Sequence, residues 1–138
     1  MIKGIQERRL VLQLRNAVLP VDYAGALHTM VIDLDLHGSE MVMIYLQHPR
    51  QGSVLADACA GLIRPQQGSA RFLGKDWSAL PSDTENALRG RIGRVFVAGN
   101  WINHLTLLEN ILLSQRYHTR RSTAELNQEA GRLAKGFG

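Results

Sequence analysis

The residues that could do chemistry gather in one short polar loop, residues 47–53, which holds a histidine, an arginine and a serine. An apolar run, residues 41–46, precedes the loop and predicts a buried strand, and a small-residue apolar segment, residues 54–62, predicts a helix after it. Strand, loop and helix in this order form the frame of a phosphate-binding loop, in which backbone N–H groups and a helix N-terminus hold the anion. This loop, however, has no lysine and a single glycine.

Composition places the chain among ordinary globular proteins. Its 138 residues, of which 45% are hydrophobic and 20% charged, suit one domain or part of a larger one with a sizeable core. The net charge of +4 comes from scattered basic residues, which favours a solvated surface over a nucleic-acid-binding face. No apolar run approaches the roughly 18 residues of a membrane-spanning helix, so we expect no span. Residues 1–9 lack the apolar core of a signal peptide.

Cysteine and histidine usage points away from a disulfide or metal site. Cys59 is the single cysteine and lies inside the predicted helix, which indicates a buried structural thiol in a reducing compartment. The five histidines are dispersed. His48, in the loop, has no Cys, Asp or Glu at ligand spacing, so it is read as a solvated side chain and no metal is expected.

Hydrophobic periodicity predicts the first strands. Residues 1–9 are polar and are expected to form a flexible lead-in. Period-two alternation over residues 10–16 and again over residues 27–37 predicts two half-exposed strands, a pattern that suits an antiparallel sheet. Pro20 and Asp22 are expected to end the first strand.

The rest of the chain predicts further strands and helices. Strands are expected at 69–73 and 92–97, and helices within 77–91 and at 106–114 and 124–134. Ser82, with Glu85 three residues later, has the spacing of a capping box. Together these patterns predict an α/β fold with one strand–loop–helix unit and an antiparallel β part.

Three stretches resemble the nucleotide-binding domain of ATP-binding cassette (ABC) transporters. They are LDLHGSE, ACAGLIRPQQGSARFLGKDW and RIGRVFVAGNWINHLTLLENILL. Family members typically show a strand ending in Gly-Glu, the phosphate loop, a helix closing with "aGL..p..G.i.f.G.d", and later "iG.vfQ" and "lTv.eNi". The resemblance covers residues 10–138 and implies a partial P-loop NTPase-like domain, its N-terminal half, that takes ATP and Mg²⁺.

The phosphate loop departs from the family pattern G-x-x-x-x-G-K-[ST], which aligns with residues 46–53. Leu46 and Gln51 replace the two glycines, and Gly52 replaces the lysine. Only Ser53 keeps its type, so Gly52 and Ser53 are the loop positions at which the resemblance implies contact with nucleotide. Without glycines the backbone cannot easily form an anion nest, and without lysine the β- and γ-phosphates lose their neutralising charge.

Two further loop residues bear on phosphate binding. Pro49 removes one backbone N–H from the loop. Arg50 is basic and nearby, and it could substitute for the lysine, but its position in the loop should aim it elsewhere. The expected loop is therefore a degenerate Walker A motif that binds nucleotide weakly or not at all.

Other landmarks of the resemblance lie outside the loop. Val97 stands where the family has a glutamine that reaches the metal and the attacking water, so ATP hydrolysis by this chain is not expected. Tyr23 lies near the position of an adenine-stacking aromatic, and the alternative is a tyrosine partly buried in the sheet. Trp101 and Ile102 fall in the loop that packs under the coupling helix of the membrane partner in the family. We expect a docking surface there, or else Trp101 folds back on its own domain.

The family's signature motif, Walker B aspartate and switch histidine have no counterpart in these residues. A natural short product and a fragment of a longer chain both remain open. Two functions follow from the resemblance: a degenerate ATP-binding subunit-like component of an ABC transporter that does not hydrolyse ATP on its own, or a catalytically dead interaction module. The resemblance implies a transmembrane permease subunit and a second nucleotide-binding subunit as partners, and the interaction module would pair with a permease or an intact ATPase. It also implies a peripheral place at the cytoplasmic face of a membrane, and no nucleic acid.

Overall fold

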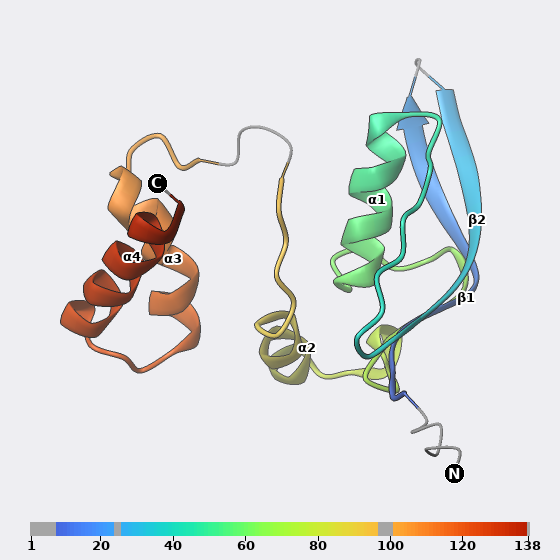
Figure 1. Ribbon diagram of the computed structural model, residues 1–138. Helices are drawn as coiled ribbons and strands as arrows, with labels where there is room; N and C mark the ends of the chain where they lie inside the picture. The colour runs from blue at the N-terminus through green and yellow to red at the C-terminus, as the bar shows by residue number, and fades with distance from the viewer. Residues whose placement is uncertain (1–7, 24–25, 97–100, 138) are drawn as a thin grey trace, which may run out of the picture. The chain divides into compact units, whose positions relative to one another are not determined.

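The computed structural model describes residues 8–23, 26–96 and 101–137 (Figure 1), with the side chains of residues 22–28 outside the description. The chain divides into two units, Met1–Ile92 and Gly93–Gly138. The first contains the sheet and three helical segments. The second contains a pair of helices.

The first unit is built on a four-stranded antiparallel sheet. Its strands are β1 (Leu10–Tyr23), β2 (Ala26–His37), β3 (Gln67–Phe72) and β4 (Lys75–Asp76), in the order β2-β1-β3-β4. The alternation that predicted β1, β2 and an antiparallel sheet is thereby confirmed. On the outer face of β2, the Asp35 carboxylate accepts a hydrogen bond from Gln13 Nε2 at 3.1 Å and pairs with Arg15 at 2.5 Å. The first of these bonds is the largest of the influences that lower the pKa of Asp35.

Strand β1 continues through Pro20 and Asp22, where the sequence predicted a break. Pro20 is paired with Thr29 of β2, whereas the pairing of β1 with β3 ends at Val18. Proline cannot donate to a ladder and is therefore tolerated where a strand has a neighbour on one side only. The expected break is wrong because β1 is an edge at this point.

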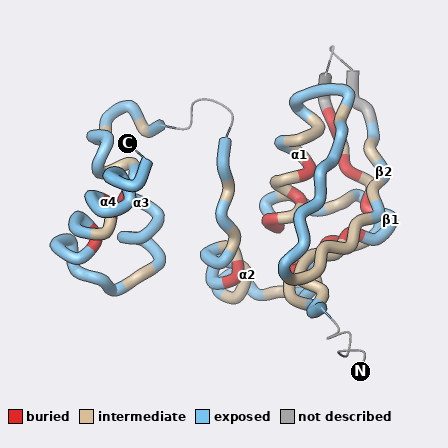
Figure 2. The backbone as a smooth tube through the Cα atoms, in the orientation of Figure 1, coloured by how far each residue is buried: buried red, intermediate tan, exposed pale blue. Residues whose placement is uncertain are grey.

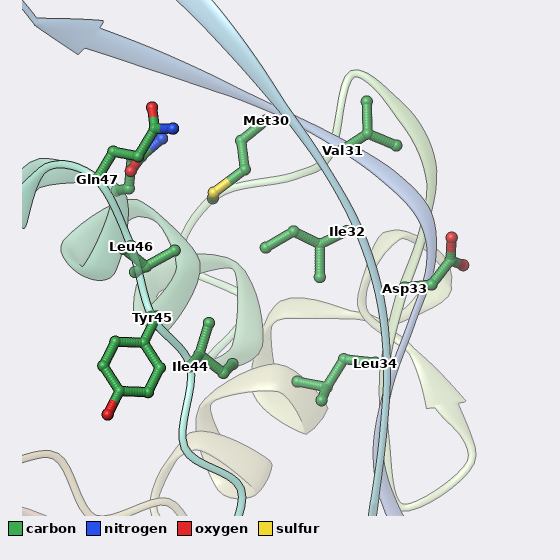
Figure 3. Close-up of a pocket in the computed structure, with 10 residues that line it drawn as sticks. Met30, Val31, Ile32, Asp33, Leu34, Ile44, Tyr45, Leu46 and Gln47 are labelled. Atoms are coloured by element: carbon green, nitrogen blue, oxygen red, sulfur yellow. The ribbon is translucent and has the colours of Figure 1, made fainter.

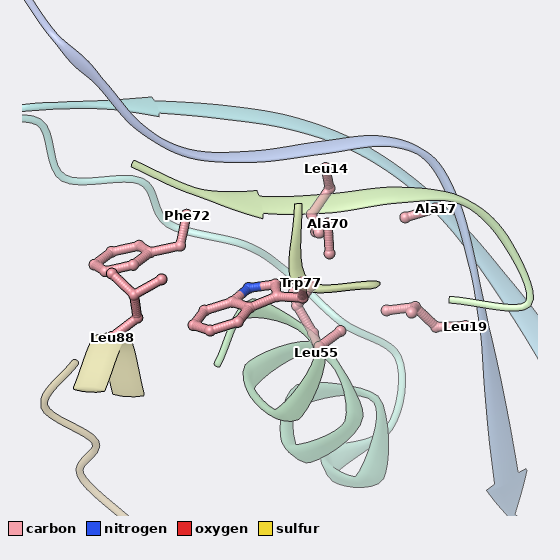
Figure 4. Packing of buried hydrophobic residues seen from close by; sticks show 9 residues of the cluster. Leu14, Ala17, Leu19, Leu55, Ala70, Phe72, Trp77 and Leu88 are labelled. Atoms are coloured by element: carbon pink, nitrogen blue, oxygen red, sulfur yellow. The ribbon is translucent and has the colours of Figure 1, made fainter. Parts of the chain in front are cut away.

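Helix α1 (Pro49–Cys59) packs on one face of the sheet, and the core of the first unit lies between them (Figure 4). Figure 2 shows the buried positions gathered along β1 and along the side of α1 that faces the sheet. The buried side chains are those of Leu14, Ala17, Leu19, Leu55, Ala58, Ala70, Phe72, Trp77 and Leu88. The rings of Phe72 and Trp77 stack with their centroids 6.0 Å apart.

Two short helical segments complete the first unit, η1 (Trp77–Ala79) and α2 (Ser82–Arg89). The capping box expected at Ser82 is wrong, because the N-cap of α2 is Pro81 and the backbone N–H of Glu85 donates to the Pro81 carbonyl at 3.0 Å. The Glu85 carboxylate instead pairs with two arginines. One is Arg89, four residues later on the same helix, where such a pair is well placed.

Two apolar runs expected to be strands, the first of them a buried one, are not strands in the described residues. Residues 41–46 and 92–96 have no regular secondary structure. Met41 and Tyr45 are 93% and 90% exposed, so the expectation that this segment is covered on both faces is also wrong. A strand needs a neighbouring backbone to satisfy its N–H and C=O groups, and no described residue pairs with either segment.

The second unit is a pair of helices, α3 (Leu107–His118) and α4 (Thr123–Phe137), which contact each other through Leu112, Leu126 and Ala130. Both helices were expected, and both run past their expected C-terminal ends. Thr106 caps α3: its backbone N–H donates to Glu109 Oε2 at 2.8 Å, and Glu109 N–H donates to Thr106 Oγ1 at 3.3 Å. None of the helices in the described ranges is both long enough and apolar enough to cross a bilayer.

Candidate functional site

The candidate site is the N-terminal end of α1, where the frame of a phosphate loop would present its N–H groups. Helix α1 begins at Pro49, with His48 as its N-cap. The last five of the eight positions aligned with the family loop, residues 49–53, are therefore already helical. The turns that would wrap a phosphate are replaced by the first turn and a half of a helix.

Hydrogen bonds inside this end of the helix occupy groups that an anion would need. The backbone N–H of His48 donates to the Gln51 side-chain oxygen at 3.0 Å. The backbone N–H of Gln51 donates to the His48 carbonyl at 3.1 Å. Pro49 has no N–H to offer. A helix N-terminus attracts anions through its unsatisfied N–H groups, and here the chain satisfies or lacks several of them.

Backbone conformation also excludes an anion nest at the loop. Left-handed φ angles occur at Gly61, Gly68 and Gly74, and at three non-glycine positions, but at none of residues 46–53, all of which are described. A nest requires successive N–H groups to converge through such a conformation. Gly52 lacks it, and a Cβ built there would lie at an ordinary 3.6 Å from Leu46 Cδ1. Gly52 is an interior helix residue here.

The side chains at this end of α1 do not fit Mg²⁺-ATP. Ser53 is exposed on the second turn of α1, and Arg50 is exposed on the first. No lysine lies in the loop, and the described residues contain no group of three or more His, Cys, Asp or Glu side chains able to hold a metal. The two loop positions implied as nucleotide contacts, Gly52 and Ser53, lie within the first turns of α1.

The opposite end of α1 is held far more tightly. Gly61 follows the C-cap with φ +66°, the left-handed conformation that commonly ends a helix. A Cβ at Gly61 would come within 2.3 Å of a Trp77 ring atom, so only glycine fits. The Trp77 indole N–H donates to the Cys59 carbonyl at 3.2 Å. The ring thereby packs directly against the helix end.

Two arginines satisfy the last carbonyls of α1. Arg89 donates to the Ala60 carbonyl at 3.2 Å and to the Gly61 carbonyl at 2.6 Å. Arg64 donates to the Gly61 carbonyl at 2.5 Å. Cations at a helix C-terminus also oppose its partial negative charge. Sequence reasoning missed both, because Arg89 reaches the helix end from 28 residues away and no local pattern marks it.

The other predicted site residues belong to both units. Tyr23 ends β1 and pairs with Ala26, and its side chain lies outside the described residues. Val97 also lies outside them. Trp101 is 56% exposed, and Ile102, next to it, is half-buried.

The loop that carries Trp101 and Ile102 is fixed by the side chain of Asn110. Asn110 Oδ1 accepts from the Ile102 N–H at 2.8 Å, while Asn110 Nδ2 lies 3.2 Å from the Ile102 carbonyl and 3.0 Å from the Thr106 carbonyl. These contacts give Asn110 a structural role. They hold the loop in place while leaving the Trp101 indole half in solvent.

Comparison with solved structures decides the fold. The chain superposes on the ATP-binding cassette MJ0796, described as a bacterial ABC transporter cassette, with a TM-score of 0.77, 23% identity, 90% of this chain and 56% of that chain covered. A second structure of MJ0796, a dimer in a post-hydrolysis state bound to ADP and Pi, gives a TM-score of 0.76 over the same shares. The chain has the fold of an ATP-binding cassette. The resemblance seen in the sequence, and the P-loop NTPase-like fold class it implied, are confirmed.

Sequence relatives carry the same description. Two proteins of Mycobacterium tuberculosis, Rv0073 of strain H37Rv and MT0079 of strain CDC 1551, are named uncharacterized ABC transporter ATP-binding proteins. Each is 28% identical over 86 residues, or 62% of this chain. The chain spans about a quarter of the length of these relatives, 26%. No protein-family model matches it.

Proposed function

We propose that this cassette is a catalytically inactive component of an ABC-type transporter, which neither cradles the phosphates of ATP nor hydrolyses ATP on its own. The observation that carries the proposal is the start of α1 at Pro49, four residues before the hydroxyl of Ser53. The transporter class comes from the fold and from relatives named ABC transporter ATP-binding proteins.

The physical basis is the loss of charge and of backbone freedom at the same place. Phosphoryl transfer depends on positioned N–H groups, a lysine and a metal that neutralise the β- and γ-phosphates. Here the lysine position is Gly52, and the N-terminal turn of α1 closes on itself through His48 and Gln51. Val97, in place of a glutamine, removes a second group that would hold metal and water.

Calorimetric titration with ATP and Mg²⁺ tests this proposal. We expect no saturable heat from the chain at ATP concentrations up to millimolar, with MJ0796 as the positive control. Gly52→Lys should stay without binding, because one lysine does not restore the glycines or open the helix start. Replacing all of residues 46–53 by a Gly-x-x-x-x-Gly-Lys-Ser loop should introduce binding. Saturable heat from the unaltered chain would contradict the proposal and support the ATP-binding reading.

The second unit supports a role for this component as an interaction module. Trp101 exposes an aromatic ring beside the ordered Asn110 loop, and α3 leaves several apolar side chains exposed. These are Leu107, Leu108, Ile111 and Leu113. Exposed apolar patches of this kind mark protein–protein contacts. We propose that the docking partner is a transmembrane permease, or an intact ATPase beside it, at the cytoplasmic face of a membrane.

Co-purification with a candidate permease tests the docking role. Trp101→Ala should reduce recovery of the permease about tenfold, as expected when a central aromatic anchor is truncated. Phe137→Ala removes another exposed aromatic, on α4, and serves as the matched control with unchanged recovery. Equal recovery with both variants would remove Trp101 from the docking surface.

A further inference from the structure

The hollows of the two units differ in what lines them. In the first unit, a hollow of about 380 Å³ lies between β2 and residues 44–47. Figure 3 shows Ile32 and Leu34 of β2 pointing toward Ile44 across this space. Asp33 is the one charged side chain that lines it among the described residues, and Figure 3 shows Asp33 pointing away. The first hollow therefore presents no charged group to a ligand.

The second unit has a smaller hollow with charged residues in its lining. Its volume is about 230 Å³, and it lies along α3. The residues that line it are Leu105, Glu109, Leu113, Arg116 and Tyr117. Pockets that enclose a small ligand have volumes of roughly 300–1,000 Å³. This hollow is below that range, so it suits part of a wider contact surface better than an enclosed ligand.

Basic side chains follow this hollow along the chain. Residues 116–121, at the end of α3 and in the turn to α4, read Arg-Tyr-His-Thr-Arg-Arg. They include three arginines and no acidic residue. All of them are exposed except Thr119, which is half-buried. Positive charge is thus concentrated on one exposed turn of the second unit.

The acidic side chains near this turn already have partners. The Glu109 carboxylate accepts two hydrogen bonds from the capping residue of α3, each at 2.8 Å. The Glu129 carboxylate pairs with Arg132 at 2.8 Å and lies 3.6 Å from Arg121, so two guanidinium groups share it. Arg120 forms no ion pair with any described residue. The turn therefore has positive charge left for an anionic partner.

An exposed aromatic ring lies among the arginines. Tyr117 is 79% exposed, and its ring meets the His118 ring edge-on with the centroids 5.1 Å apart. Leu113, one helical turn earlier, is 43% exposed and lines the same hollow. Tyrosine has an apolar ring and a polar hydroxyl, and it is enriched where a membrane meets water. Arginine beside tyrosine is the combination that a charged lipid surface binds.

We propose that residues 116–121 form a contact surface for the headgroups of an anionic phospholipid bilayer. The arginines pair with headgroup phosphates and carboxylates, and the Tyr117 ring lies at the boundary between headgroups and acyl chains. The inference rests on the proposed function, which places the chain at the face of a membrane. Residues 116–121 contain no strand edge that a peptide could extend, and three arginines are few for the backbone of a nucleic acid.

Co-sedimentation with lipid vesicles tests the contact. The 138-residue chain is mixed with vesicles of phosphatidylcholine, or of phosphatidylcholine with about one third phosphatidylserine. At low salt we expect at least about tenfold stronger binding to the anionic vesicles, since each arginine near such a surface contributes about fivefold. Salt at about 1 M should remove most of this difference, because the Debye length falls to about 3 Å.

Two matched double variants separate this turn from net charge. Arg120→Gln with Arg121→Gln, and Arg8→Gln with Arg9→Gln, each remove two positive charges from exposed side chains. The first should weaken binding to anionic vesicles about thirtyfold. The second should weaken it about threefold at most, because charges away from the contact are screened. Tyr117→Ala should weaken it about fivefold and leave its salt dependence unchanged. Far-UV circular dichroism checks that each variant folds.

Three results would overturn the inference. The unaltered chain binds neutral and anionic vesicles equally, or the two double variants weaken binding equally, or a polyglutamate peptide or a DNA duplex binds residues 116–121 more tightly than the anionic vesicles do. Saturable heat from ATP, or permease recovery that Trp101→Ala leaves unchanged, would contradict the proposed function and leave the vesicle result as it stands. Failure of the vesicle experiment leaves those two measurements unaffected.

Discussion

The two ends of α1, a helix of 11 residues, are closed by different kinds of contact. At the C-terminal end, Trp77 and Arg89 come from two separate segments and donate hydrogen bonds to the carbonyls of Cys59, Ala60 and Gly61. At the N-terminal end, the groups that close the first turn come from the loop itself, His48 and Gln51. The C-terminal end of α1 is therefore held by contacts from distant parts of the chain, and its N-terminal end by contacts within the loop.

This contrast indicates that the packing of α1 on the sheet does not depend on the phosphate loop. The contacts that fix α1 against the sheet run through Leu55 and Ala58 in its C-terminal half and through the cluster at its C-terminal end. The loop contributes little to them, since most of its residues are exposed. Loop positions are therefore free to change without loss of the fold, as fold and function are separable in general.

A matched pair of glycine substitutions should give the largest difference between the two ends. Gly61→Ala forces a left-handed alanine against the Trp77 ring, and we expect it to lower the free energy of unfolding by roughly 2–5 kcal/mol. Gly52→Ala lies in ordinary helix with 3.6 Å of clearance and should raise it by about 0.5–1 kcal/mol. Urea denaturation measures both. Similar losses from the two variants would mean that the N-terminal end is also tightly built.

Removing the guanidinium at the C-terminal end should have the next largest effect. Arg89→Met keeps much of the side-chain length but leaves the carbonyls of Ala60 and Gly61 without that donor. We expect a loss of about 1–3 kcal/mol in unfolding free energy. The control is Arg50→Met at the exposed N-terminal end, which should change stability by no more than about 0.5 kcal/mol. An Arg89 effect as small as that of Arg50 would contradict the assigned role.

Removing the hydrogen bond that closes the N-terminal turn of α1 should lower the free energy of unfolding less than the changes at the C-terminal end. Gln51→Ala removes the oxygen that accepts the His48 N–H, and we expect a loss of about 0.5–1 kcal/mol, typical of a helix cap. Gln51→Glu keeps an acceptor and adds a negative charge to the first turn, so it should retain or slightly raise stability. If Gln51→Ala instead leaves thermal stability unchanged, the bond to His48 does not hold this turn.

The reactivity of the Cys59 thiol should report how tightly the C-terminal end of α1 is packed. Burial raises the pKa of Cys59 to about 11. At pH 8 we expect iodoacetamide to modify it much more slowly in the folded chain than in urea, because the thiolate is the reactive form. The raised pKa favours the neutral thiol in the folded state. The stability it contributes is therefore complete below the unfolded pKa near 9 and is lost as the pH rises toward 11. Equal rates in both states would show that this helix end is open.

Local patterns were enough for much of the fold. Alternation located β1 and β2 and their antiparallel pairing, since one face of each packs on the core and the other meets water. The side chains of Thr106 and Glu109 start α3 through contacts within four residues, which is why the start of that helix could be read from the sequence. The absence of a lysine from residues 46–53 needed no structure at all.

Other features were decided only in three dimensions. Residues 41–46 have the composition of a buried strand, but a strand exists only where another backbone pairs with it, and none of the described residues does so. Arg89 closes the end of α1 through a contact across 28 residues that no local spacing announces. The sequence by itself determined that residues 46–53 hold no lysine, and no glycine at either position where the resemblance implies one. Only the tertiary structure decided that α1 starts at Pro49 and turns the loop into helix, because helix starts depend on which hydrogen bonds the folded chain can satisfy.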